Sequence, residues 1–217
     1  PRSAVHEPHV IGDLHEAGGR AVERAARPGG AVLRTLGLEV IAGLDERRAR
    51  HLAQLGGHAA YLGPNEIDMG KRESVKDIAA VLSRYLDGIV ARTYKHDDVK
   101  ELAKYATVPV INGLSDRAHP CQALGDIFTI REKFGSLEGI TLAYIGDGNN
   151  VLNSLMSAAA KVGLNMNIAT PKGYEPSKEL VKIAKAFAKA SLSKLEFSND
   201  PKLAAKDADI IYTDVWT

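Results

Sequence analysis

The feature that most constrains the fold is a regular alternation between short apolar runs and helical segments, which begins near residue 58. Short runs rich in aliphatic and aromatic residues predict buried strands, and they lie at 59–62, 89–91, 108–111, 141–145, 167–169 and 210–212. Apolar residues between these runs recur every three or four positions and predict helices, the longest of them over 119–134. Strands that alternate with helices form parallel sheets covered by helices. The sequence therefore predicts an α/β fold with two doubly wound parallel-sheet domains joined by that long helix.

The composition of the 217 residues excludes several classes of protein. Hydrophobic residues make up 45% and charged residues 25%, as in ordinary globular proteins, and no apolar run approaches membrane-spanning length. A net charge of +1 does not suit a general electrostatic contact with nucleic acid. Cys121 is the single cysteine, which excludes an internal disulfide and fits a reducing compartment. The seven histidines are scattered, so no metal site is predicted.

The first 57 residues differ from the rest in their choice of basic residue. They contain eight arginines and no lysine, whereas residues 58–217 contain five arginines and fifteen lysines. They also lack a clear hydrophobic period. We interpret 1–57 as an atypical N-terminal segment of foreign or frame-shifted coding origin, or as a divergent helical lead-in. A mitochondrial transit peptide is disfavoured because the segment carries seven acidic residues.

The sequence His119-Pro120-Cys121-Gln122 stands at the start of the long predicted helix, on which Leu124, Ile127 and Phe128 recur at helical spacing. A turn at 112–116 precedes it. Proline is favoured at the first position of a helix, which places His119 at the N-cap. An imidazole and an amide thus lie where free N–H groups and the helix dipole favour an anion. An ordinary capped helix without a ligand is the alternative interpretation.

Ligands of parallel α/β sheets bind beyond the carboxyl ends of the strands, and this rule selects a small set of polar residues. The set consists of Arg92, His119, Asp147 to Asn150, and Asp214. The planar fork of Arg92 matches phosphate or carbonyl oxygens. Asp214 is able to cap the following element or to pair with a substrate ammonium. The two asparagines that end the 147–150 turn are placed to bind a carboxylate or an amine.

The turn Gly146-Asp147-Gly148-Asn149-Asn150 also occupies the place of a dinucleotide-binding fingerprint. The third glycine of that fingerprint would fall at Val151, and no acidic residue closes the strand that ends at Thr170. Binding of a nicotinamide or flavin cofactor is therefore disfavoured. No Gly-x-Ser-x-Gly turn and no Cys–His pair indicates a covalent mechanism.

Many blocks of the sequence resemble, in the same order, those of ornithine carbamoyltransferases. Among them are 62–67 (LGPNEI), 110–116 (VINGLSD), 119–122 (HPCQ), 146–150 (GDGNN), 169–176 (ATPKGYEP) and 212–216 (YTDVW). The resemblance extends from about residue 55 to residue 217, and its turn and ending are similar to the ornithine-using branch of the family. It implies transfer of a carbamoyl group from carbamoyl phosphate to the side-chain amine of ornithine. The products would be citrulline and phosphate, and no cofactor or metal would be needed.

The resemblance also implies how carbamoyl phosphate would be bound. Arg92 and His119 would contact its carbonyl oxygen, and Gln122 its amide end, within a binding block that includes Pro120 and Cys121. Donors fixed at the carbonyl oxygen would stabilise the negative charge that attack by the amine builds there.

For the second substrate, the resemblance implies that Asn150 and Asp214 hold the amino-acid end of ornithine. The implied domains are 58–133, a partial carbamoyl phosphate-binding domain, and 134–217, a truncated, Rossmann-like ornithine-binding domain. A homotrimer is implied, without a nucleic-acid or membrane partner. The implied setting is arginine biosynthesis or a urea-cycle type step in the cytoplasm, with the mitochondrial matrix as the alternative.

Parts of the family pattern have no counterpart in this sequence. Where relatives have a phosphate-binding Ser-Thr-Arg-Thr-Arg loop, this chain has LDERRAR at 44–50, with three arginines and two acidic residues. The family's Ser-Met-Gly and His-Cys-Leu-Pro loops would follow Thr217, and Asp68 stands at a position that is often polar and uncharged in relatives. We therefore expect impaired or absent activity in this chain. An inactive module for ligand binding or subunit assembly is the alternative.

Overall fold

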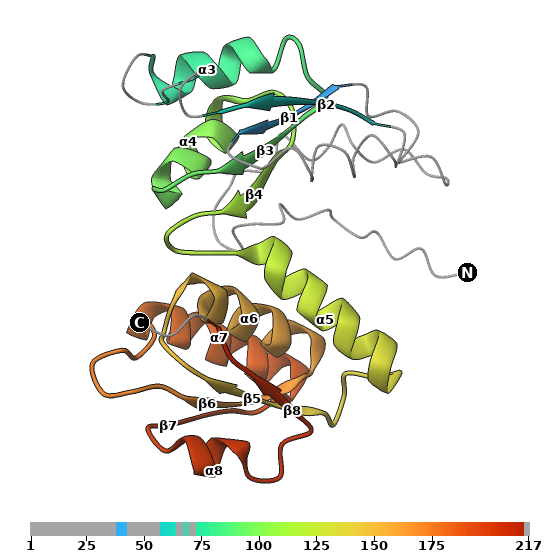
Figure 1. Ribbon diagram of the computed structural model, residues 1–217, viewed down its shortest axis with the longest axis vertical. Helices are drawn as coiled ribbons and strands as arrows, with labels where there is room; N and C mark the ends of the chain where they lie inside the picture. The colour runs from blue at the N-terminus through green and yellow to red at the C-terminus, as the bar shows by residue number, and fades with distance from the viewer. Residues whose placement is uncertain (1–37, 43–56, 64–66, 68, 70–72, 215–217) are drawn as a thin grey trace. The chain divides into compact units, whose positions relative to one another are not determined.

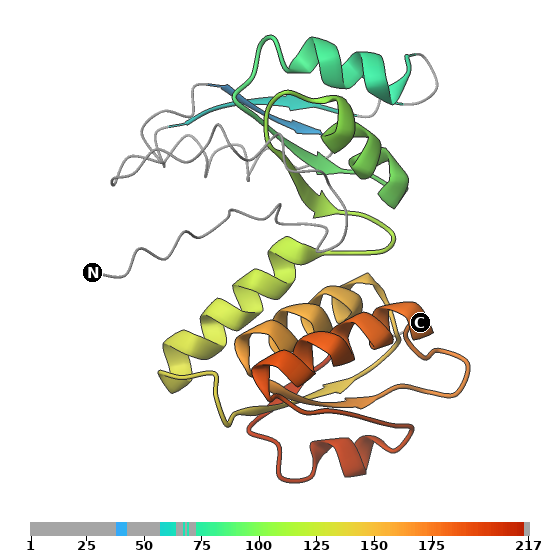
Figure 2. The same cartoon turned by 180° about the vertical axis from the view of Figure 1, so that it is seen from behind.

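The structure is a computed structural model that describes residues 38–42, 57–63, 67, 69 and 73–214 of the chain. The chain divides between Asp116 and Arg117 into two compact units, each built on a four-stranded sheet (Figure 1; Figure 2 gives the reverse view). The predicted α/β class is confirmed in both units. In the described part of the chain, no helix is both long enough and apolar enough to cross a membrane.

The first unit places its strands in the order β2-β1-β3-β4, with every neighbouring pair parallel. Its described elements are, in chain order, β1 (Leu38–Ala42), β2 (His58–Leu62), α3 (Val75–Leu82), β3 (Gly88–Arg92), α4 (His96–Tyr105) and β4 (Val110–Leu114). α3 begins after Ser74, whose hydroxyl accepts a hydrogen bond from the backbone N–H of Asp77 at 3.1 Å. Apolar side chains of α3 and α4, among them Ile78 and Leu102, pack with β3 and β4 to form the core of this unit.

Two features of this unit differ from the sequence prediction. β1 lies inside the segment 1–57, which showed no strand pattern, and it pairs with both β2 and β3. β4 continues to Leu114, so the predicted turn at 112–116 is wrong for its first three residues. Gly113 permits this extension, because a Cβ there would lie only 3.2 Å from the side chain of Val90 on β3. The close approach occurs where the register between β3 and β4 shifts.

The second unit places its strands in the order β7-β6-β5-β8, again with every neighbouring pair parallel. Its elements are, in chain order, α5 (Pro120–Phe134), β5 (Thr141–Ile145), α6 (Asn150–Val162), β6 (Asn165–Ala169), α7 (Lys178–Ser191), β7 (Leu195–Ser198), α8 (Pro201–Ala205) and β8 (Ile210–Tyr212). The helices α5, α6 and α7 lie on one face of the sheet and α8 lies on the other (Figure 1). The sequence predicted these elements except the short β7 and α8.

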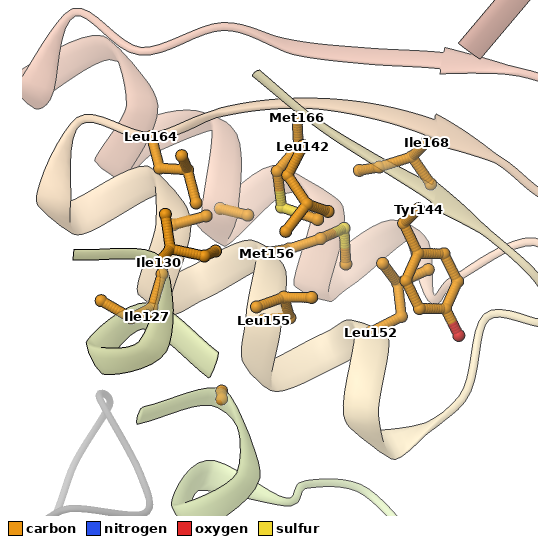
Figure 3. Close-up of a cluster of buried hydrophobic side chains, with 13 residues drawn as sticks. Ile127, Ile130, Leu142, Tyr144, Leu152, Leu155, Met156, Leu164, Met166 and Ile168 are labelled. Atoms are coloured by element: carbon orange, nitrogen blue, oxygen red, sulfur yellow. The ribbon is translucent and has the colours of Figure 1, made fainter. Parts of the chain in front are cut away.

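The apolar core of the second unit lies between the sheet and α5, α6 and α7 (Figure 3). α6 buries its apolar stripe completely, as at Leu152 and Met156. The helix predicted from the spacing of Leu124, Ile127 and Phe128 is confirmed as α5, but only Ile127 of the three is buried, whereas Leu124 and Phe128 are 45% and 62% exposed. The residues of α5 that join the core are Ala123, Ile127 and Ile130. Their spacing of four and three positions marks the side of the helix that packs on α6.

The two compact units meet between Asp116 and Arg117, and the domain boundary between residues 133 and 134 stays a prediction. α5 belongs to the second unit, because its buried residues share a core with β5 and α6. The helix ends at Gly135, whose φ of 76° favours glycine over residues with a side chain. The long helix is therefore the first element of the second unit.

Candidate active site

The strand order of the second unit creates a topological switch point beside β5. The chain leads from β5 through α6 to β6 on one side of β5, while β8 pairs with its other side. Ligands of open α/β sheets bind at the carboxyl ends of the strands that flank such a point. Asn149 and Asn150 follow β5, and Asp214 follows β8. The two predicted ornithine-binding residues, Asn150 and Asp214, therefore lie at the same edge of one sheet.

A hydrogen bond joins these two segments. Nδ2 of Asn149 donates to Oδ2 of Asp214 at 2.8 Å. Oδ1 of the same side chain accepts from the backbone N–H groups of Val151 and Leu152, each at 3.0 Å, which makes Asn149 the N-cap of α6. Asn150 is the first residue of that helix, where the dipole favours an anion. A carboxylate and a helix N-terminus therefore lie side by side, an arrangement that suits the ammonium and carboxylate groups of an amino acid.

Two tyrosines support this edge from the neighbouring strands β5 and β8. The rings of Tyr144 and Tyr212 stack with their centroids 5.8 Å apart, and the Tyr144 hydroxyl donates to the carbonyl of Asp147 at 2.9 Å. Burial raises the pKa of Tyr144, and the carboxylates of Asp214 and Asp147 raise it further. Burial also raises the pKa of Tyr212, with Asp126 as the next cause. Both phenols therefore stay protonated at neutral pH, and Tyr144 serves as a donor that fixes the loop after β5.

Gly148 lets the loop after β5 lie directly against the segment that follows β6. Its N–H donates to the carbonyl of Tyr174 at 2.7 Å. A Cβ at this position would lie 2.4 Å from the backbone nitrogen of Pro176 and 2.6 Å from the carbonyl carbon of Glu175, closer than real Cβ atoms come. This close backbone approach fixes the direction in which the loop carries its two asparagines.

The start of α5 is held by α6. The backbone N–H of His119 donates to Oγ of Ser154 at 2.9 Å, and Nδ2 of Asn153 donates to the carbonyl of Arg117 at 3.0 Å. Both anchoring residues lie about one helical turn after Asn150. The predicted N-cap at His119 is confirmed, but its half-buried imidazole makes no capping hydrogen bond. The His119 block and the two-asparagine turn are thus brought to the same end of α6.

The side chain of Gln122 is oriented by its own helix. Nε2 of Gln122 donates to Oδ1 of Asp126 at 2.8 Å, one turn later on α5. Because the amide nitrogen faces the carboxylate, the amide oxygen Oε1 is left as an acceptor. An acceptor at this position fits the NH2 group of a carbamoyl compound. The other residues of this block are Pro120, at the first helical position, and Cys121, which is exposed.

Arg92 ends β3 in the first unit, and its side chain is exposed. Backbone hydrogen bonds tie the loop that follows it to the end of β4. The N–H of Thr93 donates to the carbonyl of Leu114, and the N–H of Asp116 donates to the carbonyl of Tyr94, each at 3.0 Å. Arg92 is therefore followed directly by a loop, residues 93–95, whose backbone is tied to the end of β4.

A buried polar cluster, formed by His96, Asn112 and Ser115, lies beside this loop. Nδ1 of His96 lies 2.8 Å from Oγ of Ser115, which also accepts a hydrogen bond from Nδ2 of Asn112 at 3.2 Å. The backbone N–H of His96 donates to the carboxylate of Asp116 at 2.9 Å. These contacts attach the first residue of α4 to the end of β4 and hold the end of the loop that follows Arg92.

Two family models match the chain, one on each side of residue 135. Residues 51–132 match the model described as aspartate/ornithine carbamoyltransferase, carbamoyl-P binding domain, and residues 138–217 match the Asp/Orn binding domain of the same family. A solved structure of ornithine carbamoyltransferase from Gloeobacter violaceus is 40% identical and has a TM-score of 0.76. The match covers 91% of this chain and 68% of that chain. The chain belongs to the aspartate/ornithine carbamoyltransferase family.

Other members of the family are similar over a smaller share of their own length. The ornithine carbamoyltransferase of Pyrococcus furiosus is 50% identical, with a TM-score of 0.80, over 85% of this chain and 60% of that chain. A curated ornithine carbamoyltransferase from Bacillus thuringiensis subsp. konkukian is 56% identical over 165 residues, which is 76% of this chain and 52% of the relative. The chain thus spans about half the length of the curated relatives that it matches.

Several predictions about this carbamoyltransferase-family chain fall on residues that the structure does not describe. The segment 44–50, where relatives have their phosphate-binding loop, and Asp68 both lie outside the described residues. Among the residues that are described, no group of three or more His, Cys, Asp or Glu side chains could hold a metal ion.

Some residues that shape the site gave no signal in the sequence. Ser154 and Asn153 anchor the start of α5 from the interior of a helix, where a polar residue ordinarily faces solvent. Tyr144 lies within an apolar run and fits the pattern of a core residue equally well, and His96 stands among charged residues, where a solvated position is expected. Their hydroxyl and ring groups acquire partners through contacts between strands and helices that are distant in the chain.

Proposed function

We propose that this protein transfers the carbamoyl group of carbamoyl phosphate to the side-chain amine of ornithine, giving citrulline and phosphate. The observation that carries the proposal is the pairing of the Asp214 carboxylate with the N-terminus of α6 at the switch point of the second unit. An amino acid has a cation and an anion on the same carbon, and both find a complementary group there. The names of the two matching family models supply the substrate classes.

In the proposed reaction the neutral side-chain amine of ornithine attacks the carbonyl carbon of carbamoyl phosphate. A C–N bond forms, the C–O bond to phosphate breaks, and the amine loses a proton. Negative charge builds on the carbonyl oxygen, and we assign to Arg92 and to His119 the donation of hydrogen bonds to that oxygen. Fixed donors at such an oxygen typically contribute about 3–4 kcal/mol of transition-state stabilisation each.

The remaining assignments follow the chemistry of each side chain. We assign the NH2 group of carbamoyl phosphate to Oε1 of Gln122, because its Nε2 is held by Asp126. We assign the α-carboxylate of ornithine to Asn150 and its α-ammonium to Asp214. Holding both substrates in reacting geometry would supply much of the remaining acceleration.

We further propose that the protein acts as a homotrimer in the cytoplasm, in a reaction sequence that makes arginine. These three statements are supported by resemblance to the family. Size-exclusion chromatography with light scattering tests the first, because a trimer has three times the mass of the 217-residue chain.

The experiment that tests the proposed reaction supplies the purified chain with carbamoyl phosphate and either ornithine or aspartate. Citrulline and phosphate formed in equal amounts from ornithine would support the proposal, and formation of carbamoyl-aspartate would overturn it. Asp214→Asn is expected to weaken binding of ornithine, whereas Asp207→Asn, an exposed acid of the same unit, should leave it unchanged. If the chain forms no product, calorimetric titration with ornithine is the second measurement. Binding of ornithine would then indicate a ligand-binding module, and absence of binding would reject both the enzyme and the ligand-binding module.

A further inference from the structure

Asn149 joins two segments of the second unit that are far apart in the sequence. Its side chain carries one acceptor and one donor group, and both are used within the protein. Oδ1 accepts two backbone N–H groups at the start of α6, from Val151 and Leu152. Nδ2 donates to Asp214, which lies beyond the carboxyl end of β8, 65 positions away in sequence.

The orientation of this amide is fixed by the chemistry of its partners. Backbone N–H groups only donate, so the group that faces them must be the oxygen of Asn149. A carboxylate only accepts, so the group that faces Asp214 must be the NH2. The opposite orientation would place two donors against each other and oxygen against oxygen. The cap of α6 therefore aims the amide nitrogen at the carboxylate.

The tyrosine pair holds the same residue from a third direction. The Tyr144 hydroxyl, which donates to Asp147, also lies 3.4 Å from Oδ1 of Asn149. Tyr144 is fully buried and stacks on Tyr212, which lies two residues before Asp214. The loop after β5 and the end of β8 are thus supported by paired rings as well as by a hydrogen bond.

We infer that Asn149 is a positioning residue for ornithine, which acts by holding the Asp214 carboxylate at the start of α6. This inference rests on the proposed function, since it assigns to Asp214 the ammonium group of the amino acid. Asn149 occupies Oδ2 of the carboxylate and leaves Oδ1 for a cation. It also sets Asn150 as the first residue of α6. One side chain thus fixes the spacing between the group for the ammonium and the group for the carboxylate.

The substitution Asn149→Ser separates the two contacts of this residue. Serine is a good N-cap, so the start of α6 stays intact, but its hydroxyl is too short to reach Asp214 as well. Asn149→Ala removes both the cap of α6 and the contact with Asp214, so it also weakens the start of α6. Asn167→Ser is the matched control, because it removes an amide of β6 that donates to the carbonyl of Ala204 within the same unit.

The test is calorimetric titration of the chain with ornithine, in the presence of a non-hydrolysable phosphonate analogue of carbamoyl phosphate. Asn149→Ser is expected to weaken ornithine binding about tenfold or more, because it removes a hydrogen bond to a charged group. Affinity for the phosphonate analogue and the melting temperature should stay near those of the unsubstituted chain. Asn167→Ser should bind ornithine as the unsubstituted chain does.

Each outcome decides the matter. Ornithine binding within twofold of normal in Asn149→Ser would overturn the positioning role and leave the proposed function standing. Equal weakening of ornithine and analogue binding, or a large fall in melting temperature, would show a general structural role instead. Absence of ornithine binding by the unsubstituted chain would reject the proposed function and this role together.

Discussion

Nδ1 of His96 lies 2.8 Å from the hydroxyl oxygen of Ser115, and both side chains are buried. The contact joins the first residue of α4 to the residue that follows β4, 19 positions later. Asn112 donates to the same hydroxyl oxygen, so three polar groups meet within an otherwise apolar unit. Removing one of these polar groups is costly, because the groups that it bonded would stay buried without that hydrogen bond.

Ser115→Ala is expected to lower the free energy of unfolding by about 1–3 kcal/mol, since it removes the oxygen that both neighbours contact in a buried place. Urea denaturation of the chain measures this change. Ser136→Ala, at an exposed serine, is the matched control and should change stability by no more than about 0.5 kcal/mol. Equal stability of the two variants would contradict the structural role of the cluster.

Arg92→Lys is expected to lower the rate of citrulline formation by about 10²–10³-fold, because lysine lacks the planar fork of donors. The measurement is the initial rate of citrulline formation at saturating substrates. Arg131→Lys makes the same change at an exposed position in the last turn of α5 and should retain the normal rate. A normal rate in Arg92→Lys would remove Arg92 from the catalytic assignment.

Gly148→Ala should destabilise the protein by about 1–3 kcal/mol and weaken ornithine binding. The added Cβ would overlap the backbone of Glu175 and Pro176, so the loop that carries Asn149 has to move. Gly125→Ala is the contrasting variant, because a Cβ there meets no described atom within 4 Å and lies within a helix. It should stabilise the protein by up to about 1 kcal/mol. Thermal unfolding of the pair gives the comparison, and loss of stability in both would argue against the close approach at Gly148.

Stability should fall at alkaline pH because of Tyr144 and Tyr212. Burial raises the pKa of both phenols above the unfolded value of about 10. Above that pH the unfolded chain loses phenolic protons that the folded chain retains, so the free energy of unfolding decreases as pH rises. The contribution of each group is fully present below pH 10 and declines by at most about 1.4 kcal/mol per pH unit above it.

The measurement for this prediction is the unfolding free energy from pH 8 to pH 12. Tyr144→Phe should flatten the alkaline decline while costing stability at neutral pH, because it loses the bond to the carbonyl of Asp147. Tyr94→Phe, at an exposed tyrosine, should leave the decline unchanged. A decline of normal steepness in both Tyr144→Phe and Tyr212→Phe would assign it to other groups.

Strong local patterns made most of the fold predictable. The stripe of α6, the N-cap at His119 and the strand runs of the second unit follow from side-chain periodicity and from the preference of proline for the first helical turn. β1 was missed because it is a short strand of five residues, interrupted by Glu39, within a segment that shows no hydrophobic period. The strand part of 112–116 was missed because Asn and Gly ordinarily favour turns. Gly113 is extended because β4 pairs with the neighbouring strand β3, which approaches it closely.

The sequence by itself determined the α/β class and the residues that follow each strand, because both depend on the order of local patterns. Only the tertiary structure decided which of those residues meet. Asn149 and Asp214 are 65 positions apart, and their hydrogen bond exists because β5 and β8 pair in register. The same pairing stacks Tyr144 on Tyr212, and the packing of α5 on α6 brings His119 to Ser154. Such contacts arise from the burial of apolar faces. Local sequence patterns predict that a helix or strand has an apolar face, but they do not specify which other element packs against it.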